Sequence, residues 1–182
     1  MIILESLFFA LPIYIANSGA TLSMSIPIIK NFRLPIDLGH KIKGKRIFGD
    51  GKTFSGIFVG ILFSLIVGLL QHLLSNNIDF IFISKNLYTK LSTSLVTSFL
   101  LGFGALLGDL VKSFFKRRIG IERGKPWPLF DQLDFLVGSI LICSIVYIPS
   151  IKIIIILFIL TPIGHLLSNI AAYKLKLKKV WW

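Results

Sequence analysis

Residues 108–135 read GDLVKSFFKRRIGIERGKPWPLFDQLDF and lie between two long apolar runs. This stretch holds four of the eight acidic residues of the protein, together with six lysines and arginines. Ionisable residues this dense beside apolar segments indicate a polar site at a membrane surface. Carboxylates and cations in one place suggest a metal-assisted reaction on phosphate groups.

The composition indicates a membrane protein. The chain has 182 residues, 54% of them hydrophobic, and a mean hydropathy of +0.83. This length predicts a single domain over residues 1–182. The high hydrophobic content is typical of a protein with several membrane spans. The net charge of +12 would suggest nucleic acid in a soluble protein. Basic loops on the inner side of a membrane are a sufficient cause, so no nucleic-acid partner is expected.

Five apolar runs are each near the roughly 20 residues that a spanning helix needs. They cover residues 2–29, 54–74, 91–108, 135–151 and 153–173. Pro149 and Ser150 predict a tight turn between the last two runs. The short run 80–83 is too brief to span and is expected in an outward or interfacial loop. The predicted fold class is therefore an all-α membrane protein with five transmembrane helices and two basic cytoplasmic loops that form the active site.

The basic residues predict the orientation in the cell membrane. Seventeen of the twenty lysines and arginines lie in residues 30–53, in residues 112–130 or in the C-terminal tail. The other three are Lys85, Lys90 and Lys152. Because cytoplasmic loops carry an excess of lysine and arginine, both long basic loops and the C-terminus are expected in the cytoplasm, and the N-terminus outside.

Part of the charged stretch predicts a helix that continues past the membrane. Asp109, Lys112, Ser113 and Lys116 share one helix face if the third apolar run extends beyond the bilayer. Gly120 is a plausible end for that helix. Positive and negative side chains would then project together just outside the apolar layer.

A stiff, extended loop over residues 124–128 is expected before Asp131 and Asp134, which open the fourth helix on one face. In one interpretation these residues have structural roles only. Asp131 is then the N-cap of the helix, Asp134 stabilises the helix dipole, and the lysines and arginines only mark the cytoplasmic side of the membrane. Capping does not explain Asp109, because an unpaired carboxylate at the end of a span is costly. Three carboxylates at one membrane face suit Mg²⁺, which prefers oxygen ligands. We therefore favour Asp109, Asp131 and Asp134 as metal ligands.

The first basic loop contains a second candidate phosphate site in residues 49–56, GDGKTFSG. Glycines permit close backbone approach, and the N-terminus of the following helix can receive a phosphate. Gly51-Lys52-Thr53 looks like the end of a P-loop, but Arg46 stands where the first glycine belongs and no strand precedes it. An ordinary basic loop, with Thr53 as the N-cap of the second helix, explains the pattern about equally well.

These motifs resemble the CDP-archaeol synthase family, membrane cytidylyltransferases similar to bacterial CDP-diacylglycerol synthases. The resemblance covers the length, the five-run layout and four segments: Pro35-Ile36-Asp37, residues 49–53, residues 108–118 and residues 128–135. The Pro-Gly-His-Gly-Gly segment of the bacterial relatives is absent, and residues 125–131 occupy its place. This departure favours the archaeal ether-lipid branch.

The resemblance implies transfer of CMP from CTP to 2,3-di-O-geranylgeranylglyceryl phosphate, an isoprenoid glycerol-ether phosphate lipid, with Mg²⁺ as the cofactor. The products are CDP-archaeol and pyrophosphate. The implied catalytic residues are Asp109, Lys112, Asp131 and Asp134. The implied nucleotide-binding residues are Asp50, Lys52, Thr53, Lys112, Lys116, Arg117 and Arg118. The oligomeric state stays open.

Three alternatives remain. A CDP-alcohol phosphotransferase also clusters aspartates near membrane helices, but its Asp-Gly-x-x-Ala-Arg pattern is missing from this sequence. A CDP-diacylglycerol synthase acting on phosphatidate is a close relative. A non-enzymatic transporter or channel needs charges deep within its spans, whereas the ionisable residues here gather at one face.

Overall fold

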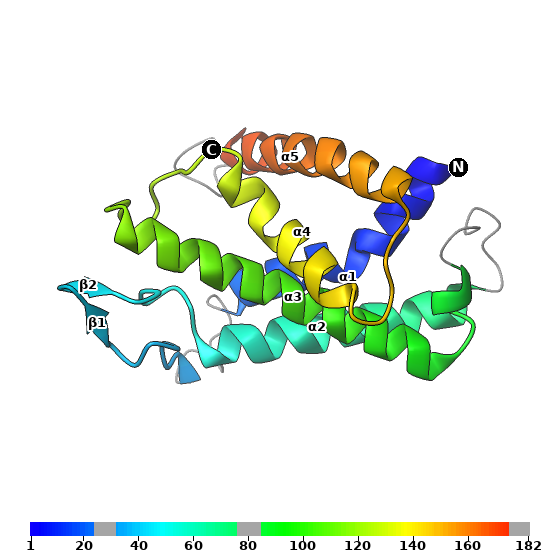
Figure 1. Ribbon diagram of the computed structural model, residues 1–182, viewed down its shortest axis with the longest axis horizontal. Coiled ribbons are helices and arrows are strands. Elements are labelled where there is room, and N and C mark those ends of the chain that lie inside the picture. The colour runs from blue at the N-terminus through cyan, green and yellow to red at the C-terminus, as the bar shows by residue number, and fades with distance from the viewer. Residues whose placement is uncertain (24–31, 76–84, 175–182) are drawn as a thin grey trace.

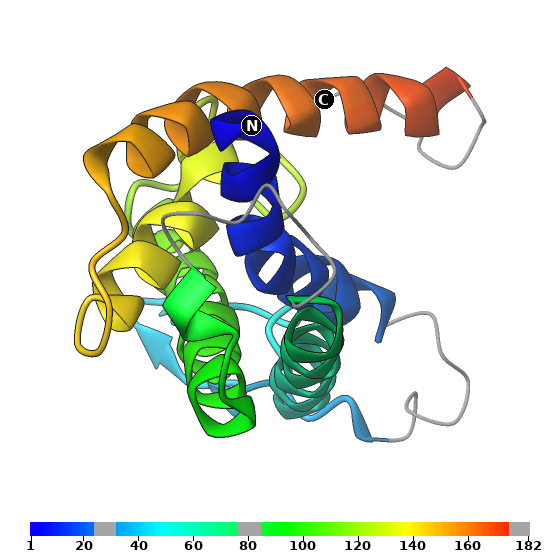
Figure 2. The ribbon, with the colours of Figure 1, turned by 90° about the vertical axis from the view of Figure 1, so that its right-hand side faces the viewer.

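The computed structural model describes residues 1–23, 32–75 and 85–174, and in these ranges the regular elements are helices and one short hairpin, joined by loops (Figure 1 and Figure 2). In chain order the elements are α1 (Ile2–Leu22), β1 (Lys41–Ile42), β2 (Lys45–Arg46), α2 (Phe54–Leu74), the 3₁₀ helix η3 (Lys85–Leu87), α3 (Leu91–Arg118), α4 (Phe130–Cys143) and α5 (Ile151–Lys174). The expected loop element at 80–83 and the end of the first apolar run lie outside the described residues.

Within the described ranges, four helices are long and apolar enough to cross a membrane: α1, α2, α3 and α5. The 14 residues of α4 extend about 21 Å, whereas the hydrocarbon core of a bilayer is about 30 Å thick. α4 begins at Phe130, in agreement with the expectation that Asp131 and Asp134 open the fourth helix. Its end differs, since the apolar run continues to Ile151 but the helix stops at Cys143. Residues 144–150 are turns and irregular backbone, in part because Pro149 disfavours the helical conformation at the residue before it.

The helices bring both basic loops to one end of the molecule. Figure 1 shows α2 and α3 side by side along the long axis, with the β1–β2 hairpin and the α3–α4 loop near the same end. The C-terminal end of α5 lies toward that end, whereas the N-terminus and η3 lie at the other. The two basic loops therefore lie at the same end of the helices, and their side of the membrane stays a prediction.

The core lies where α1, α3, α4 and α5 meet. Phe9 of α1, Leu101 of α3, Leu136 of α4 and Leu157 of α5 are buried there. Many other apolar side chains face outwards, among them Phe58 of α2 at 69% exposed. An outward apolar surface suits lipid, which is as apolar as the side chains themselves.

Glycines allow α3 and α4 to cross in backbone contact. A Cβ atom at Gly104 would lie 2.6 Å from the carbonyl oxygen of Gly138, and one at Gly108 would collide with the carbonyl oxygen of Asp134. The spacing of Gly104 and Gly108 is the small-residue pattern that lets membrane helices approach closely. The crossing holds the first turns of α4 against the point where the apolar part of α3 ends.

Replacing Gly108 with alanine should lower the stability of the protein, because the new methyl group has no room against the Asp134 carbonyl. Overpacking of this kind costs about 1–3 kcal/mol. Thermal unfolding in detergent measures the loss. The matched control is Gly164→Ala in α5, where the added Cβ would meet no other part of the described chain within 4 Å beyond its own helix backbone, and where alanine is the better helix former. Equal unfolding temperatures for the two variants would contradict the close crossing.

Candidate active site

The first basic loop is organised around the carboxylate of Asp37, which is 5% exposed. Arg46 donates to both of its oxygens, from Nη2 at 2.5 Å and from Nε at 3.2 Å. The backbone N–H groups of Gly39, Phe48 and Gly49 donate to it at 2.9–3.2 Å. One buried acid therefore fixes the backbone on both sides of the β1–β2 hairpin.

These bonds keep both groups of the pair charged. Burial would raise the pKa of Asp37, but the bonds from Arg46 and the three backbone amides outweigh it and hold the pKa well below its usual range. The hydrogen bond to Asp37, together with the contact to Asp50, raises the pKa of the Arg46 guanidinium. The loop thus has a fixed salt bridge at its centre.

The end of α3 anchors the hairpin. The Arg118 guanidinium donates to the carbonyl oxygens of Ile42, Lys45 and Arg46 at 2.5–3.1 Å. Lys45 Nζ donates back to the Arg118 carbonyl at 3.3 Å. The helix stops at Arg118, and Gly120 follows with φ +83°, as expected for a helix-ending glycine. Arg118 lines neither cavity of the site, so the structure shows it as an anchor, and its phosphate-binding role stays a prediction.

Where the first basic loop joins α2, the side chain of Lys52 points toward α3. Pro35 and Thr53 form an isolated β-bridge beside it. Thr53 Oγ1 accepts from the Gly56 N–H at 3.1 Å, as the N-cap interpretation predicted. Lys52 Nζ meets a carboxylate oxygen of Asp109 in α3. The first loop and α3 therefore share a direct ion pair.

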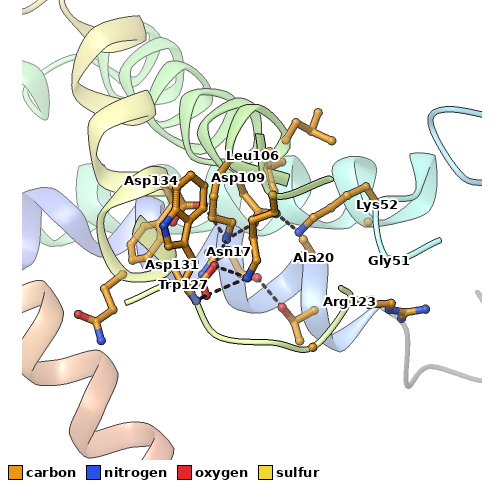
Figure 3. Close-up of a pocket in the computed structure, with 18 of the residues that line it drawn as sticks. Asn17, Ala20, Gly51, Lys52, Leu106, Asp109, Arg123, Trp127, Asp131 and Asp134 are labelled. Atoms are coloured by element: carbon orange, nitrogen blue, oxygen red, sulfur yellow. Dashed lines mark hydrogen bonds and ion pairs between the residues drawn. The ribbon is translucent and has the colours of Figure 1, made fainter. Parts of the chain in front are cut away.

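Three carboxylates converge on one ammonium where α3 and α4 cross, and Figure 3 shows their side chains gathered together. The ammonium belongs to Lys112, whose Nζ lies 3.0 Å from Asp109 Oδ1, 3.2 Å from Asp131 Oδ1 and 2.9 Å from Asp134 Oδ2. Lys116 Nζ lies 3.0 Å from both oxygens of Asp131. The predicted common face on α3 is confirmed for its charged members. We name the carboxylate–lysine cluster by its six residues: Asp109, Asp131, Asp134, Lys52, Lys112 and Lys116.

Asp131 is not the N-cap of α4, so the capping interpretation is wrong for it. Leu129, with φ +65°, holds that position without a side-chain cap bond, and Asp131 lies in the first turn. Its Oδ2 accepts from the Trp127 N–H at 2.6 Å, while Lys116 Nζ donates to the Lys125 carbonyl at 2.7 Å. Asp131 thus ties the cluster to the loop before α4.

Asp134 is the least satisfied member of the cluster. Its Oδ1 is buried and finds no hydrogen-bond partner among the residues that the structure describes, whereas Oδ2 faces Lys112. In residues 1–23, 32–75 and 85–174, no three acidic, histidine or cysteine side chains stand as a ready-made metal site. The ammonium of Lys112 takes the common point, and the three predicted Mg²⁺ ligands stay a prediction.

The cluster lines a cavity of about 570 Å³ that lies between the helices and the two basic loops (Figure 3). All five helices contribute to its wall, with Asn17 from α1 and with His165 and Asn169 from α5. The motifs in the sequence assigned neither Asn17 nor His165 to a site, so this wall was not predicted. His165 Nδ1 lies 3.3 Å from Asn169 Nδ2, one turn along an apolar helix. Polar side chains within a span were the available signal.

A second cavity of about 290 Å³ adjoins the first on the side of the loops. Three lysines line both cavities: Lys52, Lys112 and Lys116. Among the other predicted nucleotide-binding residues, Thr53 lines the first cavity, whereas Asp50 and Arg117 line the second. Asp50 is largely exposed there and pairs with Arg46 at 2.5 Å.

The variant Asp37→Asn should loosen the first loop, because an amide cannot accept all the donors around Asp37 and adds a donor of its own. A lost bond to a charged group costs about 1.5–3 kcal/mol. Hydrogen exchange of residues 37–49 measures the loss. Since the folded pKa of Asp37 is lowered, its contribution is present above about pH 4 and is lost only as the pH falls through the folded value.

The matched control is Asp50→Asn, which removes an exposed partner of the same arginine. An exposed ion pair is worth about 0–1 kcal/mol, so exchange should barely change. Equal loss of protection in both variants would show that Asp37 does not organise the loop.

Known proteins are similar in sequence to this chain over its whole length. A family model described as CarS-like, CDP-archaeol synthase, matches residues 1–182. The CDP-archaeol synthase of Methanocaldococcus jannaschii is 43% identical over 183 residues, which cover 100% of this chain and 98% of the relative. That of Pyrococcus abyssi is 38% identical, with 99% and 98% covered.

A solved structure described as "Structural insight into an intramembrane enzyme for archaeal membrane lipids biosynthesis" has the same fold. Its TM-score is 0.73 at 34% identity, and the match covers 92% of this chain and 94% of the other. This likeness agrees with several apolar helices long enough to span, and it supports a multi-pass membrane protein. The chain belongs to the CDP-archaeol synthase family.

Proposed function

We propose that this protein is an enzyme that transfers CMP from CTP to 2,3-di-O-geranylgeranylglyceryl phosphate, giving CDP-archaeol and pyrophosphate. The observation that carries the proposal is the carboxylate–lysine cluster, which the first loop, α3 and α4 build in the wall of one cavity. Family membership supplies the class of substrates, and the cluster supplies groups that suit them.

The lysines of the cluster are placed to bind a triphosphate. Lys52, Lys112 and Lys116 each pair with a carboxylate and each face both cavities. Ammonium groups form strong charge-assisted hydrogen bonds with phosphate oxygens, so a bound nucleotide offers them new partners. Thr53 stands in the wall of the first cavity, and Asp50 and Arg117 in that of the second.

The reaction is an in-line substitution at the α-phosphorus of CTP. A non-bridging oxygen of the lipid phosphate forms a bond to that phosphorus, while its bond to the oxygen that bridges the α- and β-phosphates breaks. The electron pair of the broken bond leaves on pyrophosphate, so the step needs neither an oxidant nor a proton transfer. Catalysis then consists of positioning two anions and neutralising their charge.

The donor set of the cluster fits Mg²⁺. Three carboxylates from two helices face one point, and Asp134 Oδ1 lacks a donor in the part of the chain described. Mg²⁺ prefers oxygen ligands and takes phosphate oxygens as the remainder. Asp109, Asp131 and Asp134 would hold the ion, which when bound neutralises charge on the reacting phosphates.

The geometry also suits a substrate that stays in the membrane. The first cavity reaches side chains of α1, α2 and α5, whose outer faces are largely apolar. The isoprenoid chains can therefore lie along the helices while the lipid phosphate enters the cavity. The ether-lipid substrate follows the family, and phosphatidate is not favoured.

We further propose that the end with both loops faces the cytoplasm, and that α4 with residues 144–150 makes a fifth crossing of the cell membrane. Single cysteines at Lys41 and Lys125, in a protein whose buried Cys143 is replaced by alanine, should react with an impermeant maleimide only from the cytoplasmic side. A cysteine at Asn86 in η3 should react from outside. The reverse pattern would overturn the orientation.

The variants Asp109→Asn and Asp131→Asn should lose activity by roughly 100-fold or more while the protein still folds. Asn at 131 can still accept from the Trp127 N–H, yet it removes charge from the site. The measurement is pyrophosphate release that depends on CTP, Mg²⁺ and the lipid phosphate, with the unfolding temperature recorded for each variant. The double variant should be little worse than either single one, because both ligands serve one site.

Glu122→Gln is the matched control, since this exposed carboxylate of the α3–α4 loop lines neither cavity. Its turnover should stay near normal. Near-normal turnover in both aspartate variants would remove the cluster from the reaction. Equal rates with ATP and CTP at matched concentrations would count against a cytidylyltransferase.

A further inference from the structure

Half of the residues that line the second cavity are cations. Its wall comes from the first loop, the last turns of α3 and the start of the α3–α4 loop, and of the described residues none from α1, α4 or α5 lines it. One acid, Asp50, faces six basic side chains there: Arg46, Lys52, Lys112, Lys116, Arg117 and Arg123. Such an excess of positive charge in a concave site favours a small, highly charged anion.

Five of these six cations already have partners. Arg46 pairs with two aspartates, the three lysines pair with the carboxylates of the cluster, and Arg117 donates to the Ile121 carbonyl at 2.8 Å. The sixth cation differs, since in the described part of the chain the Arg123 guanidinium forms neither an ion pair nor a hydrogen bond.

Arg123 also stands where the two cavities join. It lines both of them, and it lies over Gly51, where an added Cβ would come within 3.4 Å of its Nε. Figure 3 shows Arg123 on the side of Lys52 and Gly51, away from Asp131 and Asp134. A guanidinium presents several donors in a fixed fork that matches phosphate oxygens.

We propose that the second cavity holds the β- and γ-phosphates of CTP and then the pyrophosphate product, and that Arg123 binds them. This inference rests on the proposed function and deepens it. The α-phosphate must lie in the first cavity, since only that cavity reaches both the carboxylates of α4 and the helices along which the lipid lies. The β- and γ-phosphates then extend past the three lysines that line both cavities and lie in the second cavity.

Two products thereby separate in opposite directions. The bond that breaks joins the α-phosphorus to the bridging oxygen, so CDP-archaeol stays on the side of the helices while the pyrophosphate anion stays on the side of the loops. Pyrophosphate bound there competes with the next CTP. Inhibition by pyrophosphate, but not inhibition by CMP, should therefore depend on Arg123.

The test compares the wild type with Arg123→Ala, Arg123→Lys and Lys41→Ala. Lys41 is an exposed cation of the hairpin that lines neither cavity, so its variant controls for the loss of one charge. In Arg123→Ala the inhibition constant for pyrophosphate and the KM for CTP should rise about five- to tenfold, as expected for one charged hydrogen-bonding partner at an exposed site. Arg123→Lys should restore part of the loss, and the inhibition constant for CMP should not change.

Calorimetric binding of inorganic pyrophosphate to the detergent-solubilised chain, without CTP or lipid, tests the cavity separately from the reaction. Binding that is about five- to tenfold weaker to Arg123→Ala than to Lys41→Ala supports the inference, even if no lipid-dependent release of pyrophosphate is found and the proposed function fails. Equal binding to both variants overturns it. A rise in the CMP inhibition constant as large as that for pyrophosphate also overturns it, because Arg123 would then contact the α-phosphate or the base.

Discussion

The close crossing of α3 and α4 is the constraint on which the site depends. Gly104 and Gly108 face Gly138 with almost no side-chain volume between the two backbones. Only this contact lets aspartates of one helix reach a lysine of the other at about 3 Å. A larger residue at the crossing would push the two helices apart and move the carboxylates of α4 away from the lysine of α3. The small residues of this pair therefore set the geometry of the charges.

The cluster balances its own charge at the edge of an apolar layer. Three ammonium groups and three carboxylates neutralise one another there, and each would be costly alone in such a place. Buried ion pairs contribute little net stability, because desolvation offsets much of the attraction. Under the proposed function their value lies in exchange of partners, since a phosphate would take over the lysines while a cation would take over the carboxylates. Asp134, with one oxygen unpaired in the described structure, is the member readiest for that exchange.

Sequence periodicity predicted the parts of the site that lie on one helix. The i, i+3 and i+7 spacing of Asp109, Lys112 and Lys116 was enough to place them on one face, because helix geometry alone decides it. The role of Asp37 was not predictable, since its partners come from residues brought near only by a hairpin with no apolar pattern. The end of α4 and the polar wall from α5 were missed for a related reason. Apolar runs indicate burial or lipid contact, but they do not show where a helix ends or which polar side chain faces a cavity.

The length of α3 has a consequence for where the chemistry takes place. Its 28 residues extend about 42 Å, about 12 Å more than the hydrocarbon core of a bilayer. The surplus is enough to cross one headgroup layer of roughly 5–8 Å and to reach beyond it, and the charged residues of α3 lie in this last part of the helix. A lipid phosphate already resides at that depth, so the substrate does not have to be lifted out of the membrane to react. Extraction would expose isoprenoid chains to water at about 0.8 kcal/mol for each buried CH₂ group, and a helix of this length removes the need for it.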